Sequence, residues 1–268
     1  MKKCAVIGSS GFIGYELVCQ LMEYNDVSAV VMEKGNESDL ISEEKIFSIG
    51  RNAKVIFLDE EQFLLENEQY DTIFICHFYD ELKLKGSINS IEFTEKLFNK
   101  IIGKSKDIIF LLSTKKELAN LERTVNELSK NKDCNITYIE IPSLYGPWEP
   151  SAGLVHELIV QELGKRNVSI KNVYGSNEIL YVEDVGKAIR IISEKELKEH
   201  KYIITAKQCM SLPEDENFTG LQNMIDGIKF TQMRNYNDAT PFVIINTTSF
   251  EDGIQKQKQQ IQQHFHLY

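Results

Sequence analysis

The sequence predicts an α/β protein with a doubly wound parallel sheet and a small C-terminal lobe. Short apolar runs with strand character alternate with segments of helical periodicity, an order typical of parallel strands joined by crossover helices. A glycine-rich turn directly follows the first run. The strand-like runs are residues 4–7, 29–32, 55–58, 73–76, 108–112 and 136–141.

Helical periodicity fills the intervals between the runs and continues after the last one. The predicted helices are residues 14–24, 61–67, 88–102, 117–130, 154–163 and 184–192. Pro142, Pro147 and Pro150 lie close to two glycines and indicate a long loop after the sixth strand. We therefore expect a nucleotide-binding domain over residues 1–150, joined by 174–204. Residues 151–173 and 205–268 are expected to form the smaller lobe.

Composition restricts the kinds of partner. The 268 residues are 42% hydrophobic with a net charge of −10, and no apolar run approaches the roughly 18 residues of a membrane span. The acidic balance disfavours nucleic acid. Five scattered cysteines without a CxxC pair predict neither disulfides nor a metal site. We expect a soluble cytoplasmic protein that acts on a small molecule and binds neither nucleic acid nor membrane.

The first turn reads Gly8-Ser9-Ser10-Gly11-Phe12-Ile13-Gly14. Between a strand and a helix, three glycines allow a tight turn, close approach of the backbone to phosphate, and close packing of helix on strand. The helix N-terminus then offers N–H groups to an anion. The pattern predicts a dinucleotide site formed by Gly8, Ser10, Gly11, Phe12, Ile13 and Gly14, and the alternative is a tight turn without a ligand.

Two acidic residues bear on the cofactor. Glu33 ends the second strand-like run, where a carboxylate accepts hydrogen bonds from the adenosine ribose and repels a 2′-phosphate. NAD is therefore predicted over NADP, although Lys34 offsets part of that repulsion and a solvated surface glutamate is the alternative. Asp59 ends the third run and is expected near the adenine, with a helix N-cap as its alternative.

Four segments in order resemble the extended short-chain dehydrogenase/reductase family of NAD-dependent epimerases and dehydratases. They are the glycine turn and residues 143–147 (SLYGP), 179–185 (ILYVEDV) and 250–258. The resemblance spans most of the chain and implies a Rossmann-like fold, bound NAD, and a small-molecule substrate such as a nucleotide sugar. It also implies a homodimer formed by the helices at 88–102 and 117–130.

The family's catalytic pair is missing where the resemblance places it. Members carry Tyr-x-x-x-Lys on the helix after the fifth strand, where lysine lowers the pKa of tyrosine. Here that helix contains no tyrosine, and the strand ends at Ser113 and Thr114. Tyr79 begins a Tyr-x-x-x-Lys match one crossover earlier, beside His77. These four residues are the catalytic candidates, and coincidence or a structural role is the alternative for Tyr79 and His77.

The resemblance also places the substrate-binding residues. Ser143 and Asn177 stand where sugar-nucleotide members use Asn and Arg to hold a diphosphate, and Tyr145 belongs to the YGP loop. Losing the arginine removes a bidentate phosphate contact. Glu183 and Asp184 are expected to cap a helix rather than to form a catalytic pair.

Two functions therefore remain open. One is an NAD-dependent epimerase, dehydratase or reductase with replaced acid/base groups. The other is a nucleotide sensor or scaffold that keeps the dinucleotide turn and has lost turnover.

Overall fold

The computed structural model describes residues 1–32, 39–77, 79, 90–113, 119–130, 132–164, 170–171, 178–195, 199–212, 217–232 and 239–268. The chain divides into two compact units. The first comprises residues 1–139 and 189–202, and the second comprises 140–188 and 203–268. The sequence placed the start of the smaller lobe later, at residue 151, and assigned 174–188 to the first domain.

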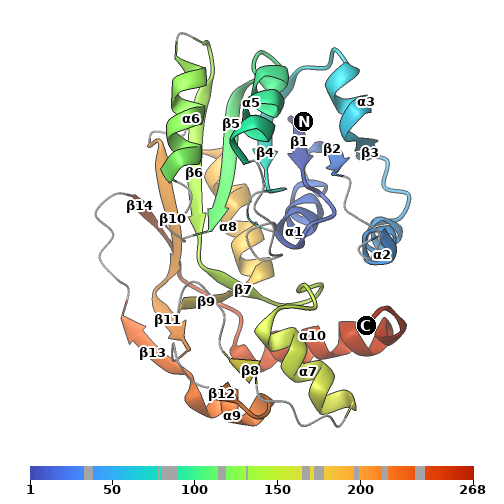
Figure 1. Ribbon diagram of the computed structural model, residues 1–268, viewed down its shortest axis with the longest axis vertical. Coiled ribbons are helices and arrows are strands. Elements are labelled where there is room, and N and C mark those ends of the chain that lie inside the picture. The colour runs from blue at the N-terminus through green and yellow to red at the C-terminus, as the bar shows by residue number, and fades with distance from the viewer. Residues whose placement is uncertain are drawn as a thin grey trace. The chain divides into compact units, whose positions relative to one another are not determined.

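The main sheet has eight strands, coloured from blue to red along the chain in Figure 1. Its order is β14-β10-β6-β5-β4-β1-β2-β3, and the pairings β3–β2, β2–β1, β1–β4 and β4–β5 are parallel. The strand order reverses between β1 and β4, where open α/β sheets bind ligands beyond the strands' carboxyl ends. The strands are β1 (Lys3–Ile7), β2 (Asp26–Val31), β3 (Val55–Asp59), β4 (Tyr70–Ile75), β5 (Ser105–Ser113), β6 (Asn135–Ile141), β10 (Lys201–Ala206) and β14 (Thr240–Ile244).

Helices cover both faces of this sheet in the first unit. One face packs Ile7, Ile75 and Phe110 against apolar residues of α3, α5 and α6. Successive strand residues point to opposite faces. Helix α1 contacts β1 and β2, and its buried Leu17 and Leu21 lie outside that cluster. The helices are α1 (Phe12–Leu21), α2 (Asp39–Ile49), α3 (Glu60–Leu65), α5 (Ser90–Ile101) and α6 (Ala119–Ser129). Helix α8 (Val182–Glu194) is divided, with residues 182–188 assigned to the second unit and 189–194 to the first.

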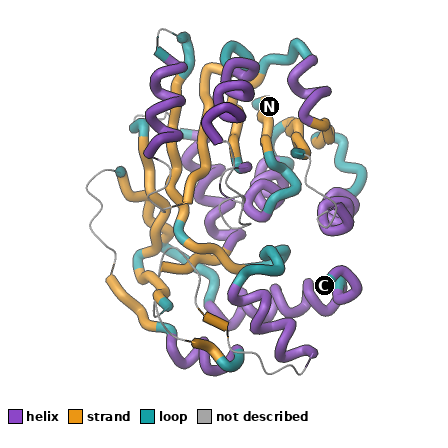
Figure 2. Tube along the Cα trace, in the orientation of Figure 1, coloured by secondary structure: helices purple, strands orange, loops and turns teal. Residues whose placement is uncertain are grey.

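The second unit has its own sheet and core. Its four-stranded sheet has the order β13-β11-β9-β7, and β12 pairs with β8. Helices α7 and α10 lie side by side (Figure 2), around a core that includes Tyr145, Leu158 and Ile254. The elements are β7 (Ser143–Tyr145), β8 (Ile170–Lys171), β9 (Glu178–Tyr181), β11 (Gln208–Ser211), β12 (Asn217–Phe218), β13 (Lys229–Gln232), α7 (Leu154–Gly164), α9 (Leu221–Gly227), α10 (Phe250–Gln263) and a 3₁₀ turn (Phe265–Leu267).

Most predicted elements are present, with shifted ends and several additions. The second strand begins at Asp26 instead of residue 29, and the predicted proline-rich loop contains β7. Helix α2 and the short strands of the second unit were not predicted. Across the described residues, no helix is both long and apolar enough to span a bilayer.

Candidate dinucleotide site

The glycine turn follows β1 at the point where the strand order reverses. Gly8 has φ = +84°, and a Cβ added to it would lie 2.9 Å from the backbone nitrogen of His77, just after β4. Its N–H and that of Ser9 both donate to the carbonyl of Val30 at 3.0 Å. Position 8 therefore needs glycine for two reasons, a left-handed backbone and contact with the neighbouring strand end.

The other two glycines bring α1 onto the turn. A Cβ on Gly14 would lie 2.0 Å from the carbonyl oxygen of Gly8. Gly11 is the N-cap of α1, with no side chain to cap the helix, and its own N–H donates to the Gly8 carbonyl at 3.0 Å. The spacing of the three glycines thus places the N-terminus of α1 directly over the end of β1.

Two hydroxyl groups are buried in this turn without a partner. Ser9 and Ser10 are each 4% exposed, and neither Oγ atom has a hydrogen-bond partner among the described residues. Buried polar atoms are normally paired. The turn has no room for side chains at its glycines, it leads into a helix N-terminus, and it holds two unpaired donors. These features fit the pyrophosphate of a dinucleotide, whose oxygens would accept hydrogen bonds from the N–H and hydroxyl groups.

Helix α2 supplies a positive charge that the sequence analysis missed. The Nζ atom of Lys45 donates to the carbonyls of Ser10 and Gly11, at 3.0 and 3.2 Å. Lys45 is only 5% exposed. No motif marks this lysine, because its position depends on a helix that the periodicity did not predict.

The remaining predicted cofactor residues fall into three cases. Phe12 and Ile13 are buried, at 2% and 0% exposure, so they can face a ligand only through backbone N–H groups. Glu33 lies outside the described residues. Asp59 is exposed and forms a capping box with Gln62 at the start of α3, where it accepts the Gln62 N–H at 2.7 Å. That contact is the N-cap alternative of the sequence analysis, and a role near adenine stays a prediction.

The catalytic candidates differ in exposure. Ser113 is half-buried at the end of β5, and Thr114 lies outside the described residues. Tyr79 is 1% exposed and His77 is 7% exposed. His77 lies beside the glycine turn through its backbone, so the turn and this candidate are neighbours in the first unit. A catalytic role for any of the four stays a prediction.

The predicted substrate residues lie in the second unit. Tyr145 is fully buried, and its hydroxyl has no hydrogen-bond partner among the described residues. Its ring packs against Phe250, with centroids 4.9 Å apart, and a Cβ on Gly253 would lie 2.6 Å from the hydroxyl oxygen. Burial raises the pKa of Tyr145. Ser143 is 7% exposed on β7, and Asn177 lies outside the described residues.

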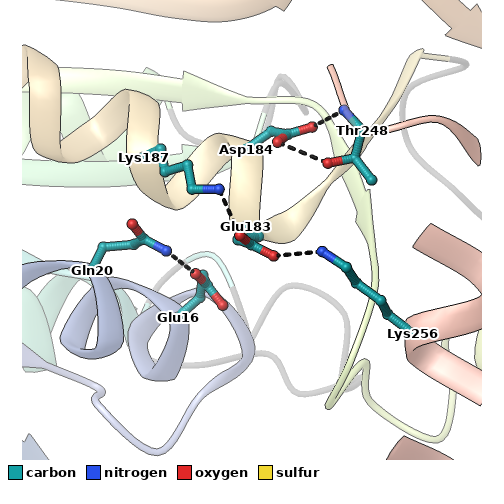
Figure 3. Close-up of polar contacts among 7 residues, drawn as sticks. All are labelled: Glu16, Gln20, Glu183, Asp184, Lys187, Thr248 and Lys256. Carbon is teal, nitrogen blue, oxygen red and sulfur yellow. Dashed lines mark hydrogen bonds and ion pairs between the residues drawn. The ribbon is translucent and has the colours of Figure 1, made fainter. Parts of the chain in front are cut away.

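Glu183 and Asp184 lie in the first turn of α8, and both make polar contacts, as Figure 3 shows. Asp184 accepts from the N–H and hydroxyl of Thr248 at 2.6 and 3.0 Å. Glu183 pairs with Lys187 at 2.5 Å and Lys256 at 3.2 Å. Partial burial raises the pKa of Glu183, but the hydrogen bonds from the two lysines outweigh it and leave the pKa below its ordinary value. The Glu183–Lys256 pair joins α8 to α10, and Asp184 binds the segment just before α10.

No cluster of metal ligands accompanies the site in the part of the chain that the structure describes. There, no group of three or more His, Cys, Asp or Glu residues is arranged to hold a metal ion.

Several solved structures resemble this chain along nearly its whole length. UDP-glucuronic acid 4-epimerase from Bacillus cereus, in complex with UDP-glucuronic acid and NAD, is 17% identical with a TM-score of 0.68, covering 97% of this chain and 99% of that chain. The dTDP-glucose 4,6-dehydratase from Streptomyces venezuelae, with NAD and TYD bound, is 11% identical with a TM-score of 0.68, covering 99% and 98%.

A third neighbour is a reductase. Yeast methylglyoxal/isovaleraldehyde reductase Gre2, complexed with NADPH, is 12% identical with a TM-score of 0.62, covering 97% of this chain and 98% of that chain. Neither a protein-family model nor a curated protein matches the sequence. At these identities the likeness shows the fold. It is the fold of the NAD-dependent epimerases and dehydratases, so the predicted Rossmann-like α/β class is confirmed, and the resemblance to that family is confirmed at the level of the fold.

Proposed function

We propose that this chain binds NAD at the glycine turn of its first unit. The observation that carries the proposal is the pair of buried, unpaired hydroxyls of Ser9 and Ser10, in a turn where the space for side chains at Gly8 and Gly14 is already filled. The uncapped first turn of α1 adds N–H donors and the positive end of the helix dipole. When bound, NAD supplies a hydride acceptor.

The cofactor choice is supported by two arguments. Glu33 disfavours the 2′-phosphate of NADP, and the epimerase and dehydratase neighbours were crystallised with NAD. The reductase neighbour with NADPH makes the choice worth measuring. We extend the proposal to a nucleotide-sugar substrate, because the epimerase neighbour binds UDP-glucuronic acid.

Catalysis by this chain would need acid/base groups other than the family pair. Helix α6 contains no tyrosine, and Tyr79 is buried. A positioned general acid/base contributes typically about 10²–10⁴-fold in rate. These facts favour a second candidate function, a nucleotide sensor or scaffold that binds NAD without turnover.

One pair of experiments tests both functions. Calorimetric titration with NAD, NADH, NADP and NADPH is expected to show binding, tightest for NAD or NADH, and no binding to any of the four would overturn the proposal. A hydride-exchange assay with nucleotide sugars then separates enzyme from sensor. If the assay detects activity, Tyr79→Phe is expected to abolish it where Tyr79 is the acid, and unchanged activity excludes that assignment.

A further inference from the structure

Helix α2 buries a lysine while it exposes apolar side chains. Between residues 40 and 49, Lys45 is the one residue that is fully buried, whereas Leu40 and Phe47 are 65% and 73% exposed. Lysine is among the residues least often buried. Ile41, Ile46 and Ile49 are half-buried, so α2 directs the ammonium group of Lys45 inward beside its isoleucines and leaves Leu40 and Phe47 in solvent.

That ammonium group bonds to two consecutive carbonyls of the glycine turn. The peptide unit is planar and trans, so its C=O and N–H point in opposite directions. The carbonyl of Gly11 accepts from Lys45 at 3.2 Å and from the N–H of Tyr15 at 3.2 Å. With this carbonyl fixed toward α1 and Lys45, the N–H of Phe12 points out of the helix N-terminus, where the first N–H groups have no intrahelical acceptor.

A second contact fixes α2 against α1. The hydroxyls of Tyr15 and Ser48 are 2.7 Å apart, and the Ser48 hydroxyl donates to the carbonyl of Lys45 at 2.7 Å. Because the Ser48 proton is used there, Tyr15 is the donor to Ser48. Burial raises the pKa of Tyr15 and so keeps that proton in place. The backbone of Lys45 is thereby tied to α1, and its side chain reaches the turn from a fixed position.

We propose that Lys45 is a positioning residue for the pyrophosphate of the bound dinucleotide. Its ammonium group holds the Ser10 and Gly11 peptide units so that the helix N-terminus faces the phosphates, and it places a positive charge beside that N-terminus in a chain of net charge −10. The inference rests on the proposed function and adds a residue outside the glycine motif.

The test compares ligands with and without phosphates. Lys45→Met keeps the length of the side chain and removes its charge and donors. We expect this variant to bind NAD and ADP about tenfold to a hundredfold more weakly than the wild type, with adenosine binding unchanged. Lys45→Arg, which keeps the charge and donors, is expected to recover most of the lost affinity. Raising the salt concentration should weaken ADP binding less in Lys45→Met than in the wild type.

A matched control lies elsewhere in the first unit. Lys104 is also a buried lysine, 9% exposed, which donates to a backbone carbonyl, that of Glu66, and lies 5.4 Å from an aromatic ring centroid. It directly precedes β5, at the amino ends of the parallel strands, whereas the glycine turn follows the carboxyl end of β1. Lys104→Met is expected to lower the free energy of unfolding like Lys45→Met and to leave ADP affinity unchanged.

The outcomes separate the inference from the function beneath it. If the wild type binds none of the dinucleotides, the proposed function fails and the inference fails with it. If the wild type binds NAD and Lys45→Met binds ADP within twofold as tightly, only the inference is overturned. Equal losses for ADP and adenosine overturn it as well, because they indicate general damage to the site. If Lys45→Met does not fold, Lys45→Gln replaces it, because glutamine keeps hydrogen-bond donors and removes the charge. The expected result is the same: weaker binding of ADP and unchanged binding of adenosine.

Discussion

At the residue scale, the glycine turn is packed too closely to admit a side chain at position 8 or 14. The Cβ position of Gly14 is 2.0 Å from the Gly8 carbonyl oxygen, and that of Gly8 is 2.9 Å from the His77 backbone. Both neighbours are backbone atoms and cannot move aside as a flexible side chain would. The glycines are therefore required by contact between β1, β4 and α1 as well as by any ligand.

Gly14→Ala is expected to lower the free energy of unfolding by about 1–3 kcal/mol, because the added methyl group forces α1 away from the turn. The same displacement moves the helix N-terminus, so affinity for NAD should fall with stability. Urea denaturation and calorimetric titration measure the two effects. Gly220→Ala is the control, since nothing lies within 4 Å of its Cβ position and its φ is 179°. Equal stability of Gly14→Ala and wild type would contradict this account of the turn.

His156 gives the second unit a dependence on pH. Its side chain is 2% exposed, Nδ1 has no partner among the described residues, and burial lowers its pKa to about 4. Between the unfolded pKa near 6.5 and the folded value, the unfolded chain binds a proton that the folded chain excludes. Stability from this residue is therefore complete above about pH 6.5 and decreases as pH falls toward 4, by about 3 kcal/mol at most.

His156→Phe keeps an aromatic ring beside Tyr268, whose ring centroid lies 4.4 Å from that of His156. We expect the variant to lose less stability than the wild type between pH 7 and pH 5, as measured by urea denaturation at each pH. Parallel stability–pH curves for the two proteins would show that His156 does not titrate in this way.

At the element scale, α3 depends on its first residues. Asp59 and Gln62 form a reciprocal capping box, with bonds of 2.7 and 3.0 Å between side chain and backbone. The helix has only six residues, so its own hydrogen bonds do little to hold it. The cap and the burial of Phe63 are what keep this segment helical.

Asp59→Ala is expected to lower the free energy of unfolding by about 1 kcal/mol, and Asp59→Asn, a good N-cap, should restore most of it. The two variants also test the prediction that Asp59 lies near the adenine of the cofactor. If Asp59→Asn keeps full stability and NAD affinity unchanged, the carboxylate serves the helix alone. Weaker NAD binding by the stable Asn variant would support contact with the cofactor.

Some strands and helices have the bounds that their sequence predicts, and others do not. The runs that became β1, β3 and β6 are within one residue of the observed strands, because each strand is a short, mostly apolar segment that is easily recognised in the sequence. Helix α2 was missed because Leu40 and Phe47 are exposed while Lys45 is buried, which weakens the expected amphipathic pattern. Strands such as β8 and β12 have two residues each and are too short to show a period.

At the scale of the whole molecule, two units each have their own hydrophobic core. The homodimer implied by the family resemblance would use α5 and α6, which pack beside each other in the first unit (Figure 1). Sedimentation velocity at micromolar concentration is expected to show a dimer. A single monomeric species would remove this prediction without affecting the proposed NAD site.

The sequence by itself determined the Rossmann-like class, the glycine turn and the order of the family-like segments, because these depend on local periodicity and on residues adjacent in the chain. Only the tertiary structure placed Lys45 on the carbonyls of Ser10 and Gly11 and left two serine hydroxyls of the turn buried without partners. It also put Tyr145 in a core instead of at a surface. Such facts depend on segments 34 to more than 100 residues apart, as in Lys45 with Gly11 and Tyr145 with Phe250, and no local pattern encodes which distant groups meet.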